Sequence, residues 1–328
     1  MDHLGRTKHM SLTKQPPLRI VIAGRARPSL EDEIRQIAPG AEIRMVAESE
    51  LERAAADADI IATVRLPPSA LAGARRLKWV QSWAAGPNEI LHDAMRKHPV
   101  PLTSCKGNGA VPLAEHAIML MLMLDRDVRR LLRAQDESRW DKFEHGELMG
   151  RTCGIIGTGH SGTDLAIKAK AFQMQVLGLR RQDKPAEHFD EVFTSKRLHE
   201  FLGRSDFVVA TAALTDETEG MLDEAAFRVM KPTAFYICFS RGGIAKPQDL
   251  ERALREGWIA GAGLDAHAVE PLPADSPFWQ MPNVYVTPHI GAITRGTIDR
   301  GNDIFLENLR RFRDGRPFIN LVDKTAGY

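Results

Sequence analysis

The feature that most constrains this chain is a short apolar stretch that runs directly into a spaced set of glycines. Residues Thr152–Ile156 have the pattern of a strand, and Gly157–Gly162 follows with the spacing G-x-G-x-x-G. A helix over Thr163–Phe172 and a strand over Gln175–Leu179 complete a βαβ unit. In such a unit the glycines permit a tight turn, close approach of a pyrophosphate and close packing of the helix. The candidate cofactor contacts are Gly157, Thr158, Gly159, His160, Ser161 and Gly162.

A glycine triplet alone can be simple turn chemistry, and methyl-donor enzymes use similar loops; the complete βαβ context favours a dinucleotide. NAD-selective sites usually place an acidic residue about twenty residues beyond the glycines. This chain has Arg180 and Arg181 there instead. Guanidinium groups can bind a 2′-phosphate through charge-assisted hydrogen bonds, so the sequence favours NADP(H) over NAD(H). The alternative is that both arginines are simply solvated.

Length and charge bound the class of protein. The chain has 328 residues, of which 43% are hydrophobic, enough for two separate cores. Basic and acidic side chains nearly balance, which leaves a net charge of +1. Because no global field would attract nucleic acid or an anionic membrane, the expected ligand is a small molecule. We find no cluster of histidine, cysteine and carboxylates with ligand spacing, and we expect no metal site.

The cysteines and the first residues bear on the compartment. Cys105, Cys153 and Cys238 lie in apolar stretches without paired spacing, which favours buried, reduced thiols. Residues 1–17 are polar, have no apolar segment of signal-peptide length, and are interpreted as a flexible tail. The longest apolar run, Ala117–Leu124, is far below the roughly 18 residues that span a bilayer. We therefore expect a cytoplasmic protein.

Apolar runs alternate with helix-like segments along the chain, which is typical of an α/β fold. We expect one long helix from Pro112 to about Gln135 and a closing helix over Arg295–Phe312. The predicted domains are a smaller flavodoxin-like substrate domain over 18–106 and 295–328, and a Rossmann-type domain over 107–294 with a doubly wound parallel sheet. Its six predicted strands are Thr152–Ile156, Val176–Leu179, Phe207–Ala210, Ala234–Phe239, Ala260–Leu264 and Val284–Val286.

Arg241, Glu270 and His289 stand in polar segments that follow the fourth, fifth and sixth of these strands. Because ligands bind outside the carboxyl ends of parallel strands, we expect the three side chains to converge. Ketone reduction needs a proton donor with a pKa suited to neutral pH, which favours His289, with Glu270 orienting its ring. Arg241 would hold a substrate carboxylate and polarise the keto oxygen. Taken singly, each residue has a structural alternative such as a cap or an ordinary ion pair.

The order and spacing of Ser240–Gly243, Gly263–Pro271 and Thr287–Gly291, together with the glycine loop and the Ser82–Gly86 segment, resemble the D-isomer-specific 2-hydroxyacid dehydrogenase family. The resemblance spans most of the chain and gives Arg241, Glu270 and His289 the same roles as the chemical argument. Among the enzymes of this family, the pair Arg180 and Arg181 favours a glyoxylate or hydroxypyruvate reductase that uses NADPH. The resemblance also implies further contacts, which are Ala85 and Gly86 for the substrate carboxylate, and Ala212, Ser240, Asp265 and His289 for the cofactor.

The sequence departs from the family pattern at Cys238, where asparagine is common, at Lys246, where an acidic residue often stands, and at Ala212–Leu214, which lacks a proline common beside the adenosine. His116 and His267 are interpreted as structural. The resemblance implies a homodimer, and the long polar segment Arg129–Gly150, with two aromatic residues, is suited to reach a partner. Packing within one chain is the alternative.

Three other functions share parts of this pattern. A formate dehydrogenase has the same fold, but that family typically pairs its histidine with glutamine, and Glu270 argues against it. A dinucleotide-sensing corepressor retains similar residues, as does a phosphite dehydrogenase. Turnover of a 2-oxo acid would separate a 2-hydroxyacid dehydrogenase from the corepressor and from the phosphite dehydrogenase.

Overall fold

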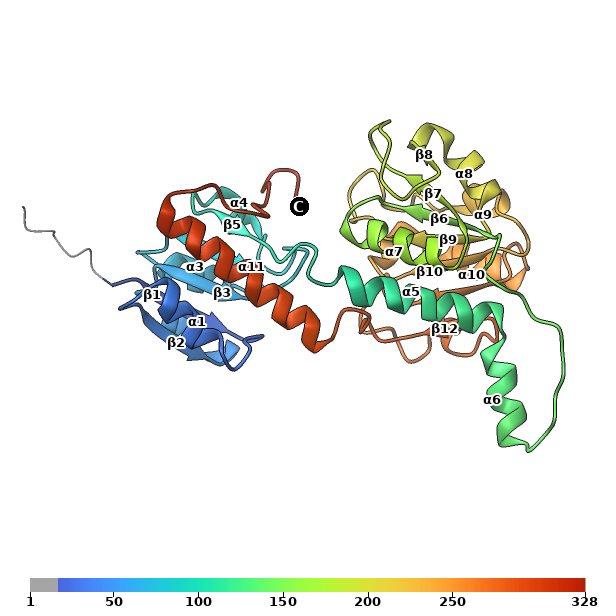
Figure 1. Ribbon diagram of the computed structural model, residues 1–328, viewed down its shortest axis with the longest axis horizontal. Helices are drawn as coiled ribbons and strands as arrows, with labels where there is room; N and C mark the ends of the chain where they lie inside the picture. The colour runs from blue at the N-terminus through green and yellow to red at the C-terminus, as the bar shows by residue number, and fades with distance from the viewer. Residues whose placement is uncertain (1–16, 328) are drawn as a thin grey trace, which may run out of the picture. The chain divides into compact units, whose positions relative to one another are not determined.

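The computed structural model describes residues 17–327, so the tail predicted over 1–17 lies outside the described residues except for Pro17. The chain forms two compact units (Figure 1). Among the described residues, unit 1 comprises 17–105 and 301–327, and unit 2 comprises Lys106–Arg300. The first crossing lies beside the predicted one, whereas the second lies inside the closing helix, α11 (Arg295–Asp314), and not at its first residue.

Unit 1 contains a five-stranded sheet in the order β2-β1-β3-β4-β5, with every pairing parallel. This is the flavodoxin-like order that we expected. Its elements before α11 are β1 (Arg19–Ala23), α1 (Leu30–Ile37), β2 (Glu42–Val46), α2 (Leu51–Ala55), β3 (Ile60–Thr63), α3 (Pro68–Gly73), β4 (Trp79–Ser82), α4 (Asp93–Lys97) and β5 (Leu102–Thr103).

Unit 2 contains a seven-stranded parallel sheet in the order β12-β11-β10-β9-β6-β7-β8. The order reverses between β6 and β9, the topological switch point at which doubly wound sheets bind ligands. Its elements are α5 (Ala110–Asp125), α6 (Val128–Asp136), β6 (Thr152–Ile156), α7 (His160–Ala171), β7 (Gln175–Leu179), β8 (Glu191–Phe193), α8 (Leu198–Arg204), β9 (Phe207–Ala210), α9 (Glu224–Arg228), β10 (Phe235–Cys238), α10 (Pro247–Arg255), β11 (Gly261–Leu264) and β12 (Val284–Val286).

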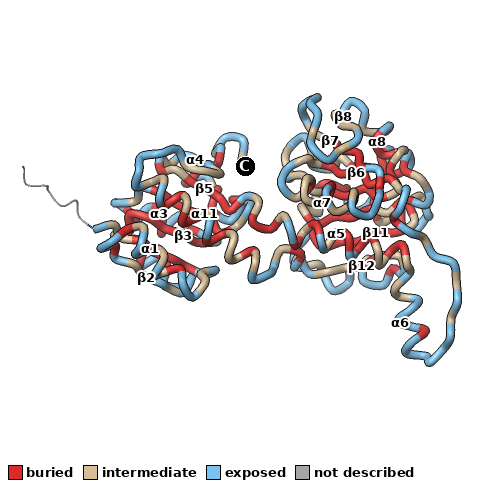
Figure 2. The backbone as a smooth tube through the Cα atoms, viewed as in Figure 1, coloured by how far each residue is buried: buried red, intermediate tan, exposed pale blue. Residues whose placement is uncertain are grey.

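Each sheet has a hydrophobic core on both of its faces, and the central strands are buried (Figure 2). In β9, Phe207 and Val209 face one core with α5 and α7, while Val208 and Ala210 face the other core with α8, α9 and α10. A strand alternates its side chains between the two faces, so a strand covered on both sides must be apolar throughout, as the sequence FVVA is. In unit 1, α11 packs Phe305 and Leu309 on the same face as α1.

The single helix expected over Pro112–Gln135 is wrong, because the chain forms two helices there. Asp127 takes a left-handed conformation, φ +45°, and ends the continuity between α5 and α6. Its carboxylate caps the new helix by accepting from Arg130 N at 3.3 Å. An aspartate tolerates this backbone better than most residues and satisfies an otherwise unpaired helical N–H. None of the helices within 17–327 has both the length and the apolar character that crossing a membrane requires.

Candidate active site

The glycine loop joins β6 to α7 at the carboxyl edge of the unit 2 sheet. Gly157 has a φ of +103°, a conformation that residues with a β carbon rarely adopt. A β carbon on Gly162 would collide with the carbonyl oxygen of Gly157, so the helix packs this closely only with glycine there. A β carbon on Gly159 would meet no atom within 4 Å. The backbone at Gly159 therefore borders open space where a ligand can approach.

Helix α7 begins at this loop with exposed backbone donors. Gly159 is its N-cap and supplies no side chain to cap it. Thr163 N, donating to Gly159 O at 2.8 Å, makes the first bond of the helix, so the N–H groups of the preceding turn, which includes Ser161, point outward. Together with the helix dipole they suit a pyrophosphate.

The neighbouring side chains close the loop from behind. The Thr158 methyl group packs over β7, and the His160 ring lies against the backbone just before α5. Thr211, at the end of β9, donates from Oγ1 to Gly157 O at 2.7 Å, and the amide of Ala212 backs onto Gly157. The loop is therefore held in shape by the protein before any ligand binds.

Ser240, which follows β10, offers a second observation that points to a ligand. Its Oγ is buried and has no hydrogen-bond partner in the part of the chain that the structure describes. A buried hydroxyl without a partner is unfavourable, and a polar atom of a bound dinucleotide would satisfy it. The open side of Gly159, the uncapped helix and this hydroxyl all fit the cofactor that the sequence predicts.

Arg180 and Arg181 follow the last residue of β7. The hydrogen bond from Gly157 N to Leu179 O, 2.8 Å, brings the end of this strand to the glycine loop. Arg180 is half-buried and Arg181 exposed, and the first carboxylate after them, Asp183, is also exposed. The position next to the glycine loop therefore carries guanidinium groups and not a carboxylate.

His289 and Glu270 are in direct contact. Nδ1 of His289 lies 2.8 Å from Oε2 and 3.0 Å from Oε1 of Glu270. The other ring nitrogen, Nε2, makes no hydrogen bond to any residue of 17–327, and the His289 side chain is 40% exposed. A carboxylate on one nitrogen fixes the ring and leaves the second nitrogen to exchange a proton with a ligand.

Glu270 is itself fixed by the chain. Its Oε1 accepts from His267 N at 2.8 Å. Burial raises the pKa of this carboxyl group, but the hydrogen bonds from the His267 backbone and the His289 ring outweigh burial and hold the pKa below its ordinary value. Glu270 is therefore a carboxylate over the neutral pH range, the charge that favours a protonated histidine beside it.

Asp265 is fully buried and holds the His289 loop from beneath. Its carboxylate accepts from Thr287 Oγ1 at 2.6 Å, from Ile290 N at 2.9 Å and from Gly291 N at 2.9 Å. These bonds restrain a loop in which His289 has a left-handed φ of +54°. Such a conformation is costly for a residue with a β carbon, by about 1–3 kcal/mol, and persists only where the surroundings impose it. The structure thus uses Asp265 to position the histidine.

Two histidines that we interpreted as structural join the same network. His116, in α5, has its Nε2 3.0 Å from Thr287 Oγ1 and 3.5 Å from Asp265 Oδ1. His267 has its Nε2 3.0 Å from Thr287 O. Thr287 was missed as a functional residue. The sequence held one signal for it. His116 stands beside an apolar run in a predicted helix, and a polar side chain at such a position requires a buried hydrogen-bond partner, which is Thr287.

Arg241 follows β10 at the carboxyl edge of the unit 2 sheet, and its loop contacts the backbone of the segment that carries Glu270. Its Nη1 donates to Ser240 O at 2.7 Å. A β carbon on Gly242 would collide with the backbone of His267, so the Arg241 loop packs directly on the segment that carries Glu270. Within residues 17–327 the guanidinium makes no hydrogen bond to Glu270 or His289.

Ala85 and Gly86 belong to unit 1, in the loop that follows β4. Ala85 is exposed and Gly86 half-buried. Their N–H groups donate to none of the residues that the structure describes, so both amides are available to a ligand. The loop is supported by Ala84, whose amide donates to Ser82 Oγ at 3.2 Å and whose carbonyl accepts from Cys105 N at 3.0 Å.

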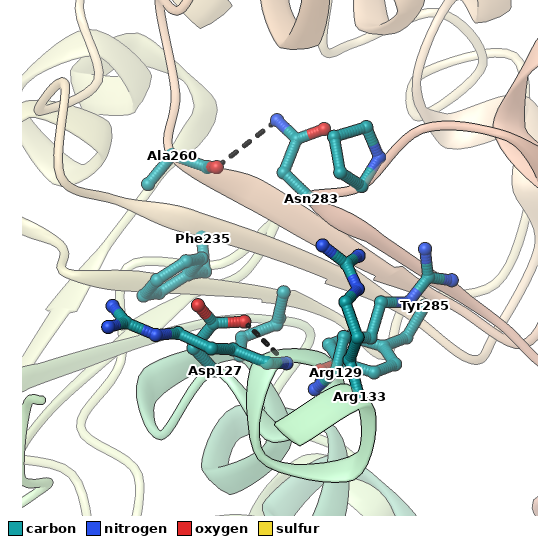
Figure 3. Close-up of a pocket in the computed structure, with 10 residues that line it drawn as sticks. Asp127, Arg129, Arg133, Phe235, Ala260, Asn283 and Tyr285 are labelled. Atoms are coloured by element: carbon teal, nitrogen blue, oxygen red, sulfur yellow. Dashed lines mark hydrogen bonds between the residues drawn. The ribbon is translucent and has the colours of Figure 1, made fainter. Parts of the chain in front are cut away.

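A pocket of about 460 Å³ lies at the opposite edge of the unit 2 sheet (Figure 3). Phe235, Ala260 and Asn283 stand at or just before the first residues of β10, β11 and β12, so this pocket faces the amino ends of the strands. Arg129, from the start of α6, donates to Met281 O at 2.9 Å and lies over the Tyr285 ring. None of the predicted site residues lines it. No cluster of potential metal ligands occurs among the described residues.

Comparison with known proteins places the sequence among dehydrogenases. Residues 118–291 match the D-isomer specific 2-hydroxyacid dehydrogenase NAD binding domain. A glyoxylate reductase of Korarchaeum cryptofilum is 34% identical over 77% of this chain and 78% of its own length. A glyoxylate reductase of Thermococcus onnurineus is also 34% identical, over 82% of this chain and 84% of its own length.

Solved structures show the same likeness. A D-isomer specific 2-hydroxyacid dehydrogenase family protein of Aeromonas salmonicida superposes with a TM-score of 0.83 at 30% identity, covering 94% of this chain and 100% of its own. An NADPH-dependent glyoxylate/hydroxypyruvate reductase of Sinorhizobium meliloti, solved with NADP and sulfate, has a TM-score of 0.82 at 29% identity and covers 95% of this chain and 100% of its own.

Proposed function

The chain belongs to the D-isomer specific 2-hydroxyacid dehydrogenase family, and from this premise we propose that it reduces a small 2-oxo acid to the 2-hydroxy acid with NADPH. As a family member it is an NAD(P)-dependent oxidoreductase that acts on CH–OH groups. Glyoxylate and hydroxypyruvate are the proposed substrates, supported by the names of its relatives. The observation that carries the proposal is the 2.8 Å contact between His289 and Glu270, which leaves Nε2 open.

The proposed chemistry needs one hydride and one proton. The loop from Gly157 to Gly162 would hold a reduced nicotinamide cofactor, which would supply the hydride to the carbonyl carbon of the substrate. Nε2 of His289 gives its proton to the carbonyl oxygen as negative charge develops there, and Glu270 stabilises the imidazolium before transfer. Arg241 holds the substrate carboxylate and polarises the keto oxygen. The amides of Ala85 and Gly86 bind the same carboxylate. In the oxidative direction His289 takes the proton back.

The cofactor is proposed to be NADP(H), and NAD(H) is the alternative. The pyrophosphate is assigned to the glycine loop and the first turn of α7, from Gly157 to Gly162, and the 2′-phosphate to Arg180 and Arg181. Ala212 and Ser240 are proposed to make further contacts with the cofactor. Asp265 is proposed to act near the nicotinamide through the loop that it holds, because its buried oxygens already accept from three donors of that loop.

The test measures absorbance of the reduced nicotinamide while the protein is mixed with glyoxylate or hydroxypyruvate. NADPH is compared with NADH, and wild type with His289→Ala. His199→Ala is the matched control, because His199 is exposed on α8 and takes no part in the site. We expect turnover that prefers NADPH and falls by about 10²–10⁴-fold in His289→Ala alone.

Other outcomes separate the alternatives. Binding of NADPH without turnover of any 2-oxo acid would favour a dinucleotide-sensing protein. Reduction of NADP⁺ on addition of phosphite would favour a phosphite dehydrogenase. Equal activity of His289→Ala and wild type would remove the proposed proton donor.

The proposed assembly is a homodimer formed through unit 2. Helix α6 exposes Leu131 and Leu132 at 43% and 54%, and Trp140, in the extended segment that follows, is 88% exposed. This segment and α6 project from the sheet of unit 2 (Figure 1). Large apolar side chains that extend from the body of a unit are typical of an association surface. We assign the enzyme to the cytoplasm, where three buried, unpaired cysteines remain reduced.

A further inference from the structure

The loop that follows β1 in unit 1 holds an arginine in an unfavourable backbone conformation. Gly24 has a φ of +69° and Arg25 a φ of +30°. The left-handed region suits glycine but is costly for a residue with a β carbon. Asn302, fully buried in α11, imposes the shape, because its Nδ2 donates to Arg25 O at 2.9 Å and its Oδ1 accepts from Arg27 N at 2.8 Å.

The two arginines of this loop are treated differently by their surroundings. Arg27 forms ion pairs with Glu33 and, at 2.7 Å, with Asp303. Arg25 is exposed, and its guanidinium forms no ion pair or hydrogen bond within residues 17–327. Glu48 approaches the preceding residue, Gly24, but forms no ion pair with Arg25. Arg25 therefore presents an unneutralised charge from a restrained loop.

Arg25 lies at the same edge of the sheet as the proposed carboxylate loop. β1, β3 and β4 are parallel neighbours, so the loops after them share the carboxyl edge. Trp83 Nε1 donates to Ala23 O at 3.1 Å and ties the end of β1 to the loop after β4. Burial raises the pKa of the Cys105 thiol to about 12, and the charge of Arg25 acts against that rise. Cys105 in turn bonds Ala84, beside Ala85 and Gly86.

The loop after β3 lies between the Arg25 loop and the Ala85–Gly86 loop, and its arginine, unlike Arg25, is paired with a carboxylate. Arg65, after β3, is paired with Glu89, at 2.9 Å from Nη2 and 3.1 Å from Nε. β3 separates β1 from β4, and two strand spacings amount to about 10 Å. If the Gly86 amide holds one end of a substrate, Arg25 would therefore contact an atom several bonds further along the same substrate.

We propose that Arg25 binds the far end of the substrate and that this chain favours 2-oxo acids with a second carboxylate. The inference rests on the proposed function, which assigns the first carboxylate to Ala85 and Gly86. A guanidinium is suited to a carboxylate because its planar donors bond both oxygens. Glyoxylate, which has no far end, would bind without using Arg25.

The test compares 2-oxoglutarate with 2-oxopentanoate, which have the same chain length and differ by the second carboxylate, and uses glyoxylate as reference. Wild type, Arg25→Gln and Arg25→Lys are assayed with NADPH. Arg75→Gln is the matched control, because Arg75 is an exposed arginine that precedes β4, at the amino edge of the same sheet, and has no ion pair among the described residues.

Wild type should prefer 2-oxoglutarate by about 10- to 100-fold in kcat/KM, and Arg25→Gln should remove that preference mainly through KM. Arg25→Lys should keep part of it. Activity of Arg25→Gln with glyoxylate should stay within about twofold of wild type, which also shows that the variant folds. Arg75→Gln should change nothing.

Turnover of glyoxylate without preference for 2-oxoglutarate, or an equal fall for all three acids in Arg25→Gln, would overturn the role of Arg25. Failure of wild type to reduce any 2-oxo acid would instead overturn the proposed function. In that case calorimetric titration of the NADPH-loaded protein with 2-oxoglutarate decides separately. Binding that Arg25→Gln weakens and Arg75→Gln keeps supports the inference, and absence of binding contradicts it.

Discussion

At the scale of single residues, His289 shows how a side chain is prepared by its neighbours. The ring is held by Glu270 on one nitrogen, and the backbone is held in a left-handed conformation by bonds from the following amides to Asp265. The role of Glu270 could be argued from the sequence, because a carboxylate after one strand and a histidine after the next share an edge. The contact of His116 with Thr287 could not, because it depends on how α5 crosses the sheet. The contact of His267 with Thr287 O could not either, because it depends on the path of the loops after β11 and β12.

Glu270→Gln tests the charge in this pair. In wild type the lowered pKa keeps Glu270 ionised as the pH falls through 4.5, its ordinary value, so the pair is lost only at lower pH. Glutamine carries no negative charge and has no carboxyl group to titrate. Glu270→Gln should therefore have a reduced kcat/KM at neutral pH and should lack the acid limb that protonation of Glu270 causes in wild type below pH 4.5. The pH profiles of wild type and variant, measured with glyoxylate, check this. Superimposable profiles would mean that the carboxylate charge does not act on His289.

The cysteines give a second prediction at this scale. Burial raises the pKa of Cys105 and of Cys153 to about 12, and it also raises the pKa of Cys238. Because the thiolate is the reactive form, native protein should react with a disulfide reagent such as DTNB at none of the three positions near neutral pH. All three should react after unfolding. Rapid release of one equivalent from native protein would show that one of these sites opens.

At the scale of elements, the strands were easier to predict than the breaks between helices. β6, β7 and β9 are short apolar runs between turns, and a parallel sheet covered on both faces requires such runs. β8 was missed, since a three-residue edge strand has too few residues for a pattern. The break at Asp127 was missed because a single aspartate in a helix-forming stretch does not by itself mark a turn. The left-handed backbone of Asp127 and its cap on Arg130 N, which place the turn, are visible only in the structure.

Two glycines of the α7 loop should separate stability from cofactor binding. Gly162→Ala places a methyl group against the carbonyl of Gly157 and should lower the melting temperature of the cofactor-free protein. Gly159→Ala meets no atom within 4 Å and should leave that temperature unchanged. It should nevertheless raise the Kd for NADPH by about tenfold or more, because its methyl group occupies the approach to the backbone.

Thermal unfolding without cofactor and titration with NADPH measure the two effects. Each variant is the control for the other, since both add one methyl group to the same loop. Normal NADPH affinity in Gly159→Ala would show that the pyrophosphate does not approach at this glycine.

At the scale of the whole molecule, the division into two units followed from the sequence, but the exact second crossing did not. The closing helix was expected from its apolar spacing, and it exists as one continuous element, α11. Nothing in a continuous helical pattern marks Gly301 as the residue where it passes into unit 1. That point is set by the tertiary contacts of Phe305 and Leu309.

The proposed homodimer predicts a change in mass. Replacing Leu132 and Trp140 together by serine removes two large exposed apolar side chains without touching a core. The wild-type protein should elute at twice the chain mass in size exclusion with light scattering, and the variant should shift toward one chain mass. If the variant remains a dimer, the interface lies elsewhere on the molecule. If the wild-type protein is a monomer, the proposed homodimer is wrong.

Unit 1 is built from two stretches of chain that unit 2 separates, and this has a consequence for biosynthesis. Trp79 stacks on Phe305 and contacts Phe318, with ring centroids 5.3 and 5.0 Å apart. On the ribosome, the early strands of unit 1 emerge first, but these aromatic partners are translated only after all of unit 2. Residues 17–105 must therefore wait with part of their core uncovered while unit 2 completes itself. That waiting segment is where a nascent chain would most need a chaperone.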